Sequence, residues 1–162
     1  MMIKPLVEEN HPVLHREVKD VTVFNDDLKV LIQDLEDTLF HHDGVGIAAP
    51  QIGVDLKVAL VDMEQDGILQ LINPKIISYS DETESDVEGC LSIPNVFGLV
   101  DRSTTIVIKA NDLKGNDIEM TAHDDIARII QHEVDHLYGH LFTEKMTKQL
   151  TEAELEEMFG EE

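Results

Sequence analysis

A short segment carries two histidines and a glutamate at the spacing of a metal site. The segment is His132–His136, with the sequence HEVDH. On a helix, residues four positions apart lie on the same face, so both imidazoles can reach one ion while Glu133 lies beside a water bound to it. Polar pairs on a helix surface give the same spacing. The apolar segment Ile126–Ile130 favours a semi-buried helix, however, and buried imidazoles need partners such as a metal.

A metal that activates water needs a third protein ligand and one open position. The extended metalloprotease pattern places a third histidine where this chain has Phe142, so we disfavour that class. His140 lies beyond Gly139, a predicted helix end, and is more typical of a surface residue. Cys90 is a soft ligand, although a lone cysteine is more often a small buried apolar residue. Downstream carboxylates are also available, on what resembles a solvated helix face: Glu152, Glu154, Glu156 and Glu157.

The segment Gly44–Gln51, with the sequence GVGIAAPQ, carries few large side chains. Its glycines and alanines let another chain approach the backbone closely. A plain turn from helix to strand would have a similar composition. The segment lacks the lysine and the preceding strand of a phosphate-binding loop, and the acidic charge of the chain also argues against phosphates.

Two segments with a 3.6-residue apolar period predict helices next to these motifs. The first is Asp26–His42, which Gly44 ends, and the second is Asp124–Tyr138, which Gly139 ends. A short terminal helix begins at a capping box in Thr151–Glu154. Because the second helix carries the HEVDH sequence, we expect the metal site on a largely buried helix.

Short runs rich in β-branched residues predict strands, and turn residues separate them. Asp66-Gly67 and Lys114-Gly115 predict the turns of two antiparallel hairpins, while the acidic segment Asp81–Asp86 predicts a loop. We therefore expect an α+β fold in which one buried helix packs on a mixed or antiparallel sheet. The predicted strands are Lys57–Asp62, Leu69–Ile72, Ile76–Ser80, Val96–Val100, Thr104–Ala110 and Asp117–Thr121.

The composition indicates one acidic domain over residues 1–162. Lys and Arg number 12 and Asp and Glu number 34, which gives a net charge of −22, and 42% of the residues are hydrophobic. This charge repels phosphate backbones and anionic lipids, and no basic patch is visible, so we expect neither nucleic-acid nor membrane binding. The single cysteine cannot form an internal disulfide and the N-terminus lacks a secretory signal, so we expect a cytoplasmic protein.

Three motifs in this order resemble the peptide deformylase family: Gly44–Gln51, Glu88–Ser92 (EGCLS) and Gln131–His136. The resemblance covers nearly the whole chain and implies the family's α+β fold, with mixed or antiparallel sheets around a central metal-bearing helix. It also implies removal of the formyl group from N-formylmethionine at the start of newly synthesised polypeptides. Further matching positions are Pro94, Arg102, Gly139, Leu141 and Phe142.

By matching position, the resemblance implies that Cys90, His132 and His136 bind one divalent metal ion, with water as the fourth ligand. Family members use Fe(II) natively, and Zn, Ni or Co can substitute. The residue types alone suit zinc at least as well. The resemblance also implies supporting positions around the ligands, namely Glu88, paired with Arg102, and Asp135.

The mechanism that the resemblance implies uses three further groups. Glu133 would take a proton from the metal-bound water and later deliver it to the leaving amine. The Gln51 side-chain amide and the Leu91 backbone N–H would hold the developing oxyanion.

The resemblance implies the peptide contacts as well. An extended peptide would pair in strand fashion with Val45 and Gly46 on one side and with Gly89 on the other. A methionine side chain needs an apolar, adaptable pocket, for which Val45, Ile126 and Ile129 are the candidates.

Three regions depart from the family pattern. Asp124-Asp125 stand where the family commonly has glycine and a bulky apolar residue near the methionine pocket, and Asn95 and Phe97 alter the contacts expected beyond the first residue. Both changes bear on substrate preference. The terminal segment Thr151–Glu162 carries six glutamates and no basic residue, so we do not expect ribosome docking through a basic helix.

Two other functions fit the same motifs. One is a deformylase-like relative that acts on another N-acylated peptide, and the other is a non-catalytic metal-binding relative. Intact Glu133 and Gln51 argue against the second, because a structural metal site has no use for an oxyanion donor. In each case we expect a monomer.

Overall fold

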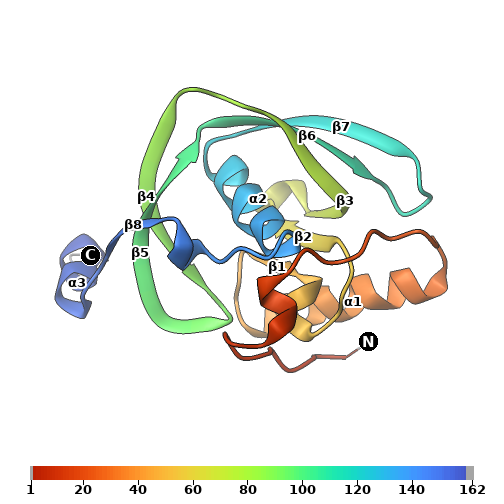
Figure 1. Cartoon of the computed structure of the whole chain (residues 1–162), viewed down its shortest axis with the longest axis horizontal. Helices are drawn as coiled ribbons and strands as arrows, with labels where there is room; N and C mark the ends of the chain where they lie inside the picture. Colours follow the sequence, from red (N-terminus) through yellow and green to blue (C-terminus); the bar gives the residue numbers. More distant parts are fainter. Residues whose placement is uncertain (1, 160–162) are drawn as a thin grey trace.

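The computed structural model describes residues 2–159, in which helix α2 (Asp124–Leu137) lies between two antiparallel β-sheets (Figure 1). One sheet has five strands in the order β1-β2-β3-β6-β7, and the other has three in the order β4-β5-β8. The expected α+β fold around a central helix is confirmed, with every pairing between named strands antiparallel. The strands are β1 (Gly46–Ala48), β2 (Val58–Asp62), β3 (Ile68–Tyr79), β4 (Thr83–Cys90), β5 (Ile93–Ser103), β6 (Thr105–Asn111), β7 (Asp117–His123) and β8 (Met146–Gln149).

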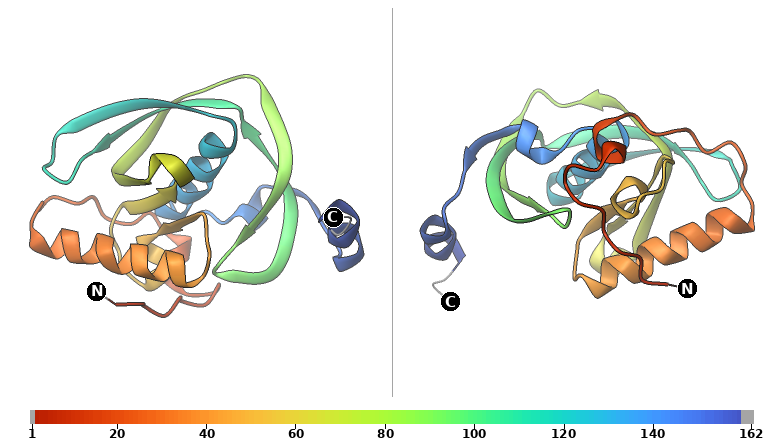
Figure 2. Two further views of the ribbon diagram at one scale, coloured as in Figure 1. Left: turned by 180° about the vertical axis from the view of Figure 1, so that it is seen from behind. Right: turned by 60° about the horizontal axis from the view of Figure 1, so that its bottom comes forward.

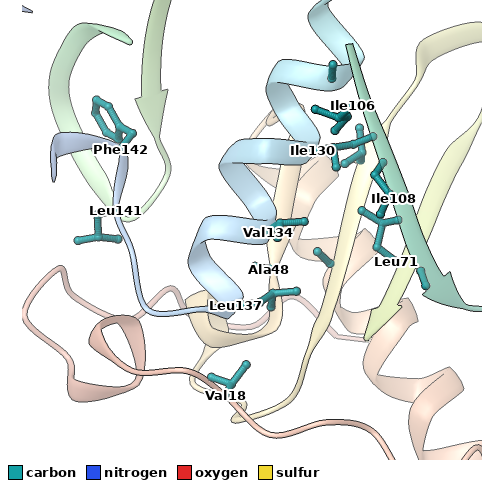
Figure 3. Packing of buried hydrophobic residues seen from close by; sticks show 14 of the residues in the cluster. Val18, Ala48, Leu71, Ile106, Ile108, Ile130, Val134, Leu137, Leu141 and Phe142 are labelled. Atoms are coloured by element: carbon teal, nitrogen blue, oxygen red, sulfur yellow. The ribbon is translucent and has the colours of Figure 1, made fainter. Parts of the chain in front are cut away.

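Helix α2 is amphipathic, and its apolar face anchors it to the five-stranded sheet. Ile130, Val134 and Leu137 are buried on this face. Figure 3 shows Ile130 and Val134 directed toward Ile106 and Ile108, which lie on β6. Spacings of three and four residues place these side chains in one row along the helix. The opposite side of α2 is therefore left for the HEVDH polar residues.

The end of α2 lies where the sequence predicts it. Gly139 has a φ of +87°, and a Cβ there would lie 2.7 Å from backbone atoms of Arg16. Glycine is required for both reasons, since only it adopts this conformation without strain and leaves room for the neighbouring chain.

Helix α1 (Asp26–His41) also matches its predicted range to within one residue. The Asn25 side chain caps it by accepting hydrogen bonds from the backbone N–H groups of Asp27 and Leu28. Its inward face packs against β1 and β2 in a second apolar cluster. The buried members of this cluster are Val21, Leu28, Ile32, Leu35, Leu39, Ile47, Ala49, Val58, Leu60 and Ile72.

Both predicted hairpins are confirmed, β2 with β3 and β6 with β7. The two short strands predicted around residues 69–80 form one strand, β3. Its pairing with β6 shifts between Ile72 and Lys75, and Asn73 has a φ of +52°. This irregularity interrupts the side-chain alternation, which explains why the sequence pattern indicates two strands.

The prediction of a loop at Asp81–Asp86 is wrong from Thr83 onward, because strand β4 begins there. It pairs with β5 starting at Thr83 opposite Ser103. The side chains of residues 83–86 are all exposed, so both faces of this part of the strand are polar. No alternation marks it in the sequence, and main-chain pairing alone defines it.

Helix α3 (Glu152–Phe159) lies apart from the rest of the chain (Figure 2). Its predicted capping box is confirmed, because Thr151 N donates to Glu154 Oε1 (3.2 Å) and Glu154 N donates to Thr151 Oγ1 (3.1 Å). The last three residues of the acidic terminal segment lie outside the described residues. Within residues 2–159, no helix has the length and apolar character needed to cross a membrane.

The packing of α2 gives a test of the core. Ile130 is fully buried, so Ile130→Ala should lower the free energy of unfolding by about 2–4 kcal/mol through lost contacts and the cavity that remains. Ile77→Ala removes the same atoms from a residue that is 44% exposed and should change stability by less than about 0.5 kcal/mol. Urea denaturation at fixed metal concentration measures both, and equal losses would contradict this account of the core.

Candidate active site

The three sequence motifs meet at one pocket of about 290 Å³. Residues 43–46, which lead into β1, and Gln51 contribute from one side, the end of β4 from the other, and α2 forms the base. The fold thus brings together three segments, each about forty residues from the next along the chain. The predicted site residues that line this pocket are Val45, Gly46, Gln51, Gly89, Cys90, Leu91, Ile129, His132 and Glu133.

Cys90, His132 and His136 form a cluster of potential metal ligands. One ligand atom from each lies within 4.8 Å of the others, and Cys90 Sγ is 3.3 Å from His136 Nε2. A tetrahedral ion with these donors would separate them by roughly 3.5 Å, so the cluster fits a metal after small adjustments. No other cluster of this kind occurs among the described residues.

The alternative ligands lie elsewhere. His140 is an exposed residue whose Nδ1 lies 3.3 Å from Glu144 Oε1, as expected for a surface position. The glutamates of the terminal segment belong to α3, whose described residues include none that is buried. Phe142 occupies the position of a third histidine in the extended metalloprotease pattern, and it stacks on the His132 ring with 5.9 Å between centroids. It therefore packs against a ligand instead of acting as one.

A buried carboxylate orients His132. Glu88 Oε1 accepts a hydrogen bond from His132 Nδ1 (2.9 Å), which leaves Nε2 as the nitrogen free to bind a metal. Arg102 donates to both oxygens of Glu88, each at 2.8 Å, so the expected pair is confirmed. Arg102 also donates to Asp135 Oδ2 (2.7 Å). Burial opposes ionisation of Glu88, but hydrogen bonds from Arg102 and His132 outweigh it and lower the pKa to about 2.

Glu133 has the position and the environment of a general base. It is buried, and its Oε1 has no hydrogen-bond partner among residues 2–159. Burial raises the pKa of this carboxyl to about 7, although the His132 charge opposes the shift. A base with a pKa near neutrality is suited to proton transfer at physiological pH. A Cβ at Gly46 would lie 2.5 Å from Glu133 Oε2, so a glycine is needed there.

Gln51 is fixed so that its amide nitrogen faces the ligand cluster. Its Oε1 accepts a hydrogen bond from Ala48 N (2.8 Å), which determines the orientation of the amide. Its Nε2 then lies 3.5 Å from Cys90 Sγ and 3.2 Å from Ser92 Oγ. Such a preset N–H donor can stabilise a negative oxygen that forms beside the cluster. Leu91 lines the pocket next to it.

Two edge strands border the pocket, since β1 and β4 each end their sheets. Gly46 lies opposite Val61, and Asp62 N donates to Val45 O (2.8 Å). In an antiparallel ladder, hydrogen-bonded pairs alternate with pairs that are not hydrogen-bonded. The Val45 pair is hydrogen-bonded, so Gly46 directs its N–H and C=O away from β2, toward the free edge. Gly89 lies on the other edge, packed against the Phe97 ring.

The pocket wall differs from the expectation at one helical position. Ile129 and Val45 line it as expected, but Ile126 does not, although both isoleucines pack against the main apolar cluster. Arg128 lines the pocket in addition. Sequence reasoning missed it, although its position four residues before His132 places it on the ligand-bearing face. Asp124 and Asp125 do not line this pocket.

A Cys-His-His cluster beside an unpaired, buried carboxylate defines a metal-dependent hydrolase. Residues 3–152 match the family model described as polypeptide deformylase, and the chain belongs to this family. The resemblance inferred from the motifs is thereby confirmed, and by family and fold the protein is a deformylase enzyme.

Relatives of known name and structure agree with this assignment. The chain is 50% identical to a "Peptide deformylase-like" protein of Staphylococcus epidermidis over all of both chains, and 43% identical to "Peptide deformylase 1" of Bacillus subtilis over 99% of this chain and all of that one. The crystal structure of the Thermotoga maritima peptide deformylase superposes with a TM-score of 0.88 at 36% identity, covering 91% of this chain and 99% of that one. A Met-Ala-Ser-bound Acinetobacter baumannii deformylase gives 0.85 at 31% identity, covering 89% and 99%.

The hydrogen bond between Glu88 and His132 predicts an effect on metal affinity. Glu88→Gln keeps the size of the side chain but removes the charge that orients the imidazole, so metal affinity should fall about 10–100-fold. Glu119→Gln makes the same change at an exposed position on β7 and should leave the affinity unchanged. Competition with a chromogenic chelator measures both, and unaltered affinity in Glu88→Gln would refute the orienting role.

Proposed function

We propose that this enzyme removes the formyl group from N-formylmethionine at the start of newly synthesised polypeptides, and that Glu133 is its general base. The observation that carries the proposal is the unpaired Glu133 oxygen, buried beside the ligand cluster in a pocket bordered by two free strand edges. A carboxylate left without a partner at such a place is explained by a reactant that supplies one.

The ligands of the proposed metal site are Cys90, His132 and His136, which together hold one divalent ion. A metal bound there supplies the means to lower the pKa of a water toward neutrality and to polarise a carbonyl. The mixed sulfur and imidazole donors suit Fe(II), which we propose as the native ion, and also accept Zn, Ni or Co. Burial lowers the pKa of His136 well below its ordinary value, and this favours the neutral imidazole that metal binding requires.

The chain's own groups then carry the proton and hold the charge. Glu133 accepts a proton from the attacking water as the new C–O bond forms at the formyl carbon. The negative charge that develops on the formyl oxygen is held by Gln51 Nε2 and by the Leu91 backbone N–H. When the C–N bond breaks, Glu133 returns the proton to the amine, so that formate and a free peptide N-terminus leave.

The substrate peptide lies in extended form between the two edges. The outward N–H and C=O of Gly46 pair with its backbone on the β1 side, and Gly89 faces it from β4. Val45 and Ile129 contact the first side chain. That a deformylase of the same fold binds Met-Ala-Ser supports a short peptide in this position. We propose that the enzyme acts as a cytoplasmic monomer on nascent chains and does not bind nucleic acid through a basic patch.

The role of Glu133 has a direct test. Glu133→Gln should retain the metal but lower kcat for formate release from a formyl-Met tripeptide by at least about 10²-fold, because the proton acceptor is lost. The assay uses the full chain loaded anaerobically with Fe(II) or with Ni(II), and Glu119→Gln controls for the change in chemistry. The Glu133→Ala variant serves as the inactive reference. If the unmodified enzyme releases formate no faster than this variant does, the proposed function is wrong. A panel of peptides carrying other acyl groups separates deformylation from another deacylation.

The oxyanion role of Gln51 predicts a different kinetic pattern. Gln51→Met keeps an unbranched side chain but removes the N–H donor, so kcat should fall about 10²–10³-fold while KM and metal content change little. Ser92→Ala removes the other partner of the amide and should leave kcat within about threefold. A loss that appears only in KM would indicate that Gln51 binds the peptide instead.

A further inference from the structure

Arg128 places a cation in the wall of the pocket that receives the first side chain of the substrate. It lies on α2 one turn before His132, and it lines the pocket together with Ile129 and Leu91. Its side chain is only 12% exposed, so it belongs to the interior of the site. Val45 and Val87, also in the lining, are apolar. Among the described residues that line the pocket, Arg128 is the only arginine or lysine.

Other contacts hold the guanidinium in place without using all of its donors. Arg128 Nη1 donates to Glu88 Oε2 (2.7 Å) and to Val100 O (2.9 Å), and Nη2 donates to Glu84 O. A guanidinium has five N–H donors, so Nε–H and one Nη2–H have no partner in the part of the chain that is described. Nε has no partner among these residues but is not fully buried, so solvent can reach it. Arg128 is thus a fixed, incompletely bonded donor in the lining of this pocket, and it also borders a smaller pocket beside Glu84 and Arg102.

The chemistry of a methionine side chain does not use such a donor. A thioether sulfur is a weak acceptor, whereas a sulfoxide or an amide oxygen is a strong one. An apolar side chain that displaces water from the guanidinium leaves its donors unpaired, which is unfavourable. A linear side chain of the same length that ends in an acceptor would replace the lost water.

The charges around the pocket favour a neutral acceptor over a carboxylate. Glu88 already pairs with Arg128, and Asp43 and Glu133 also line the pocket. Three carboxyl side chains therefore lie in the wall of the same pocket, and a negatively charged side chain would be repelled by them.

We propose that Arg128 is a specificity-determining residue that favours formyl peptides whose first side chain ends in a neutral hydrogen-bond acceptor, of which methionine sulfoxide is the closest in shape to methionine. The inference rests on the proposed function, because it concerns the first residue of the formylated substrate. It separates this pocket from the wholly apolar one expected for methionine.

The experiment compares three formyl tripeptides that differ only in their first residue, which is methionine sulfoxide, methionine or norleucine. Norleucine has a similar length and no acceptor. For the Ni(II)-loaded full chain, the ratio of kcat/KM for the sulfoxide peptide to that for the norleucine peptide should fall about tenfold or more in Arg128→Met, since a hydrogen bond to a charged donor is lost. Any general damage to the site through Glu88 affects both peptides and cancels in the ratio.

Lys145→Met serves as the matched control. Lys145 donates to Asp135 Oδ1 (3.0 Å) and so belongs to the same network of charges, but it does not line the pocket. Its loss should leave the ratio unchanged. A second measurement uses the deformylated peptides as competitive inhibitors, whose inhibition constants should show the same selectivity and the same loss in Arg128→Met without depending on the chemical step.

Each outcome decides one question. A ratio in Arg128→Met within twofold of the unmodified enzyme overturns the role of Arg128 and leaves the proposed function intact. Absence of formate release from all three peptides contradicts the proposed function, and the inhibition constants then still test the pocket. If Arg128→Met does not fold, Arg128→Gln, which keeps neutral N–H donors, should show a smaller loss of the ratio, and an unchanged ratio there overturns the inference.

Discussion

The buried Glu88 carboxylate is the point on which the arrangement of the site depends. Its side chain is 5% exposed, and its two oxygens accept four hydrogen bonds, two from Arg102 and one each from Arg128 and His132. These donors belong to β5 and α2, while Glu88 belongs to β4. Leaving a buried charge without partners costs several kcal/mol. The hydrogen bonds of Glu88 therefore hold β4, β5 and α2 in one fixed arrangement. Cys90 lies two residues beyond Glu88, and its thiol is held opposite the imidazoles for that reason.

The helix that carries the imidazoles satisfies two demands at once. The packing of Ile130 and Val134 against the five-stranded sheet fixes its rotation about its own axis, and this determines which residues face the pocket. His132 and His136 then point toward Cys90, and Glu133 points toward β1. A shift of one residue would turn every side chain by about 100°. The apolar face and the face that carries the two imidazoles are therefore specified together.

This coupling explains how much the sequence could predict. The periodic pattern of α2 and the HEVDH spacing are sufficient to predict the helix, its polar face and two members of the ligand cluster. Cys90 required the resemblance to a family, because β4 has polar side chains and no pattern that places its end beside a helix. Ile126 and Arg128 show that prediction from sequence is also limited within α2. Only the observed rotation of this helix about its axis shows that Arg128, and not Ile126, lines the pocket. An arginine in a helix usually indicates a solvated face.

Gly46 lies beside the buried Glu133 carboxylate, on the strand that forms the edge of the five-stranded sheet. A side chain there would overlap with Glu133 Oε2. The register of β1 directs the backbone groups of Gly46 away from β2, so they are available to a strand added at this edge. The closed environment that raises the pKa of Glu133 is thus formed partly by the same residue whose backbone groups face the free edge of β1. Under the proposed function, proton transfer by Glu133 and strand pairing with the peptide would therefore both depend on Gly46.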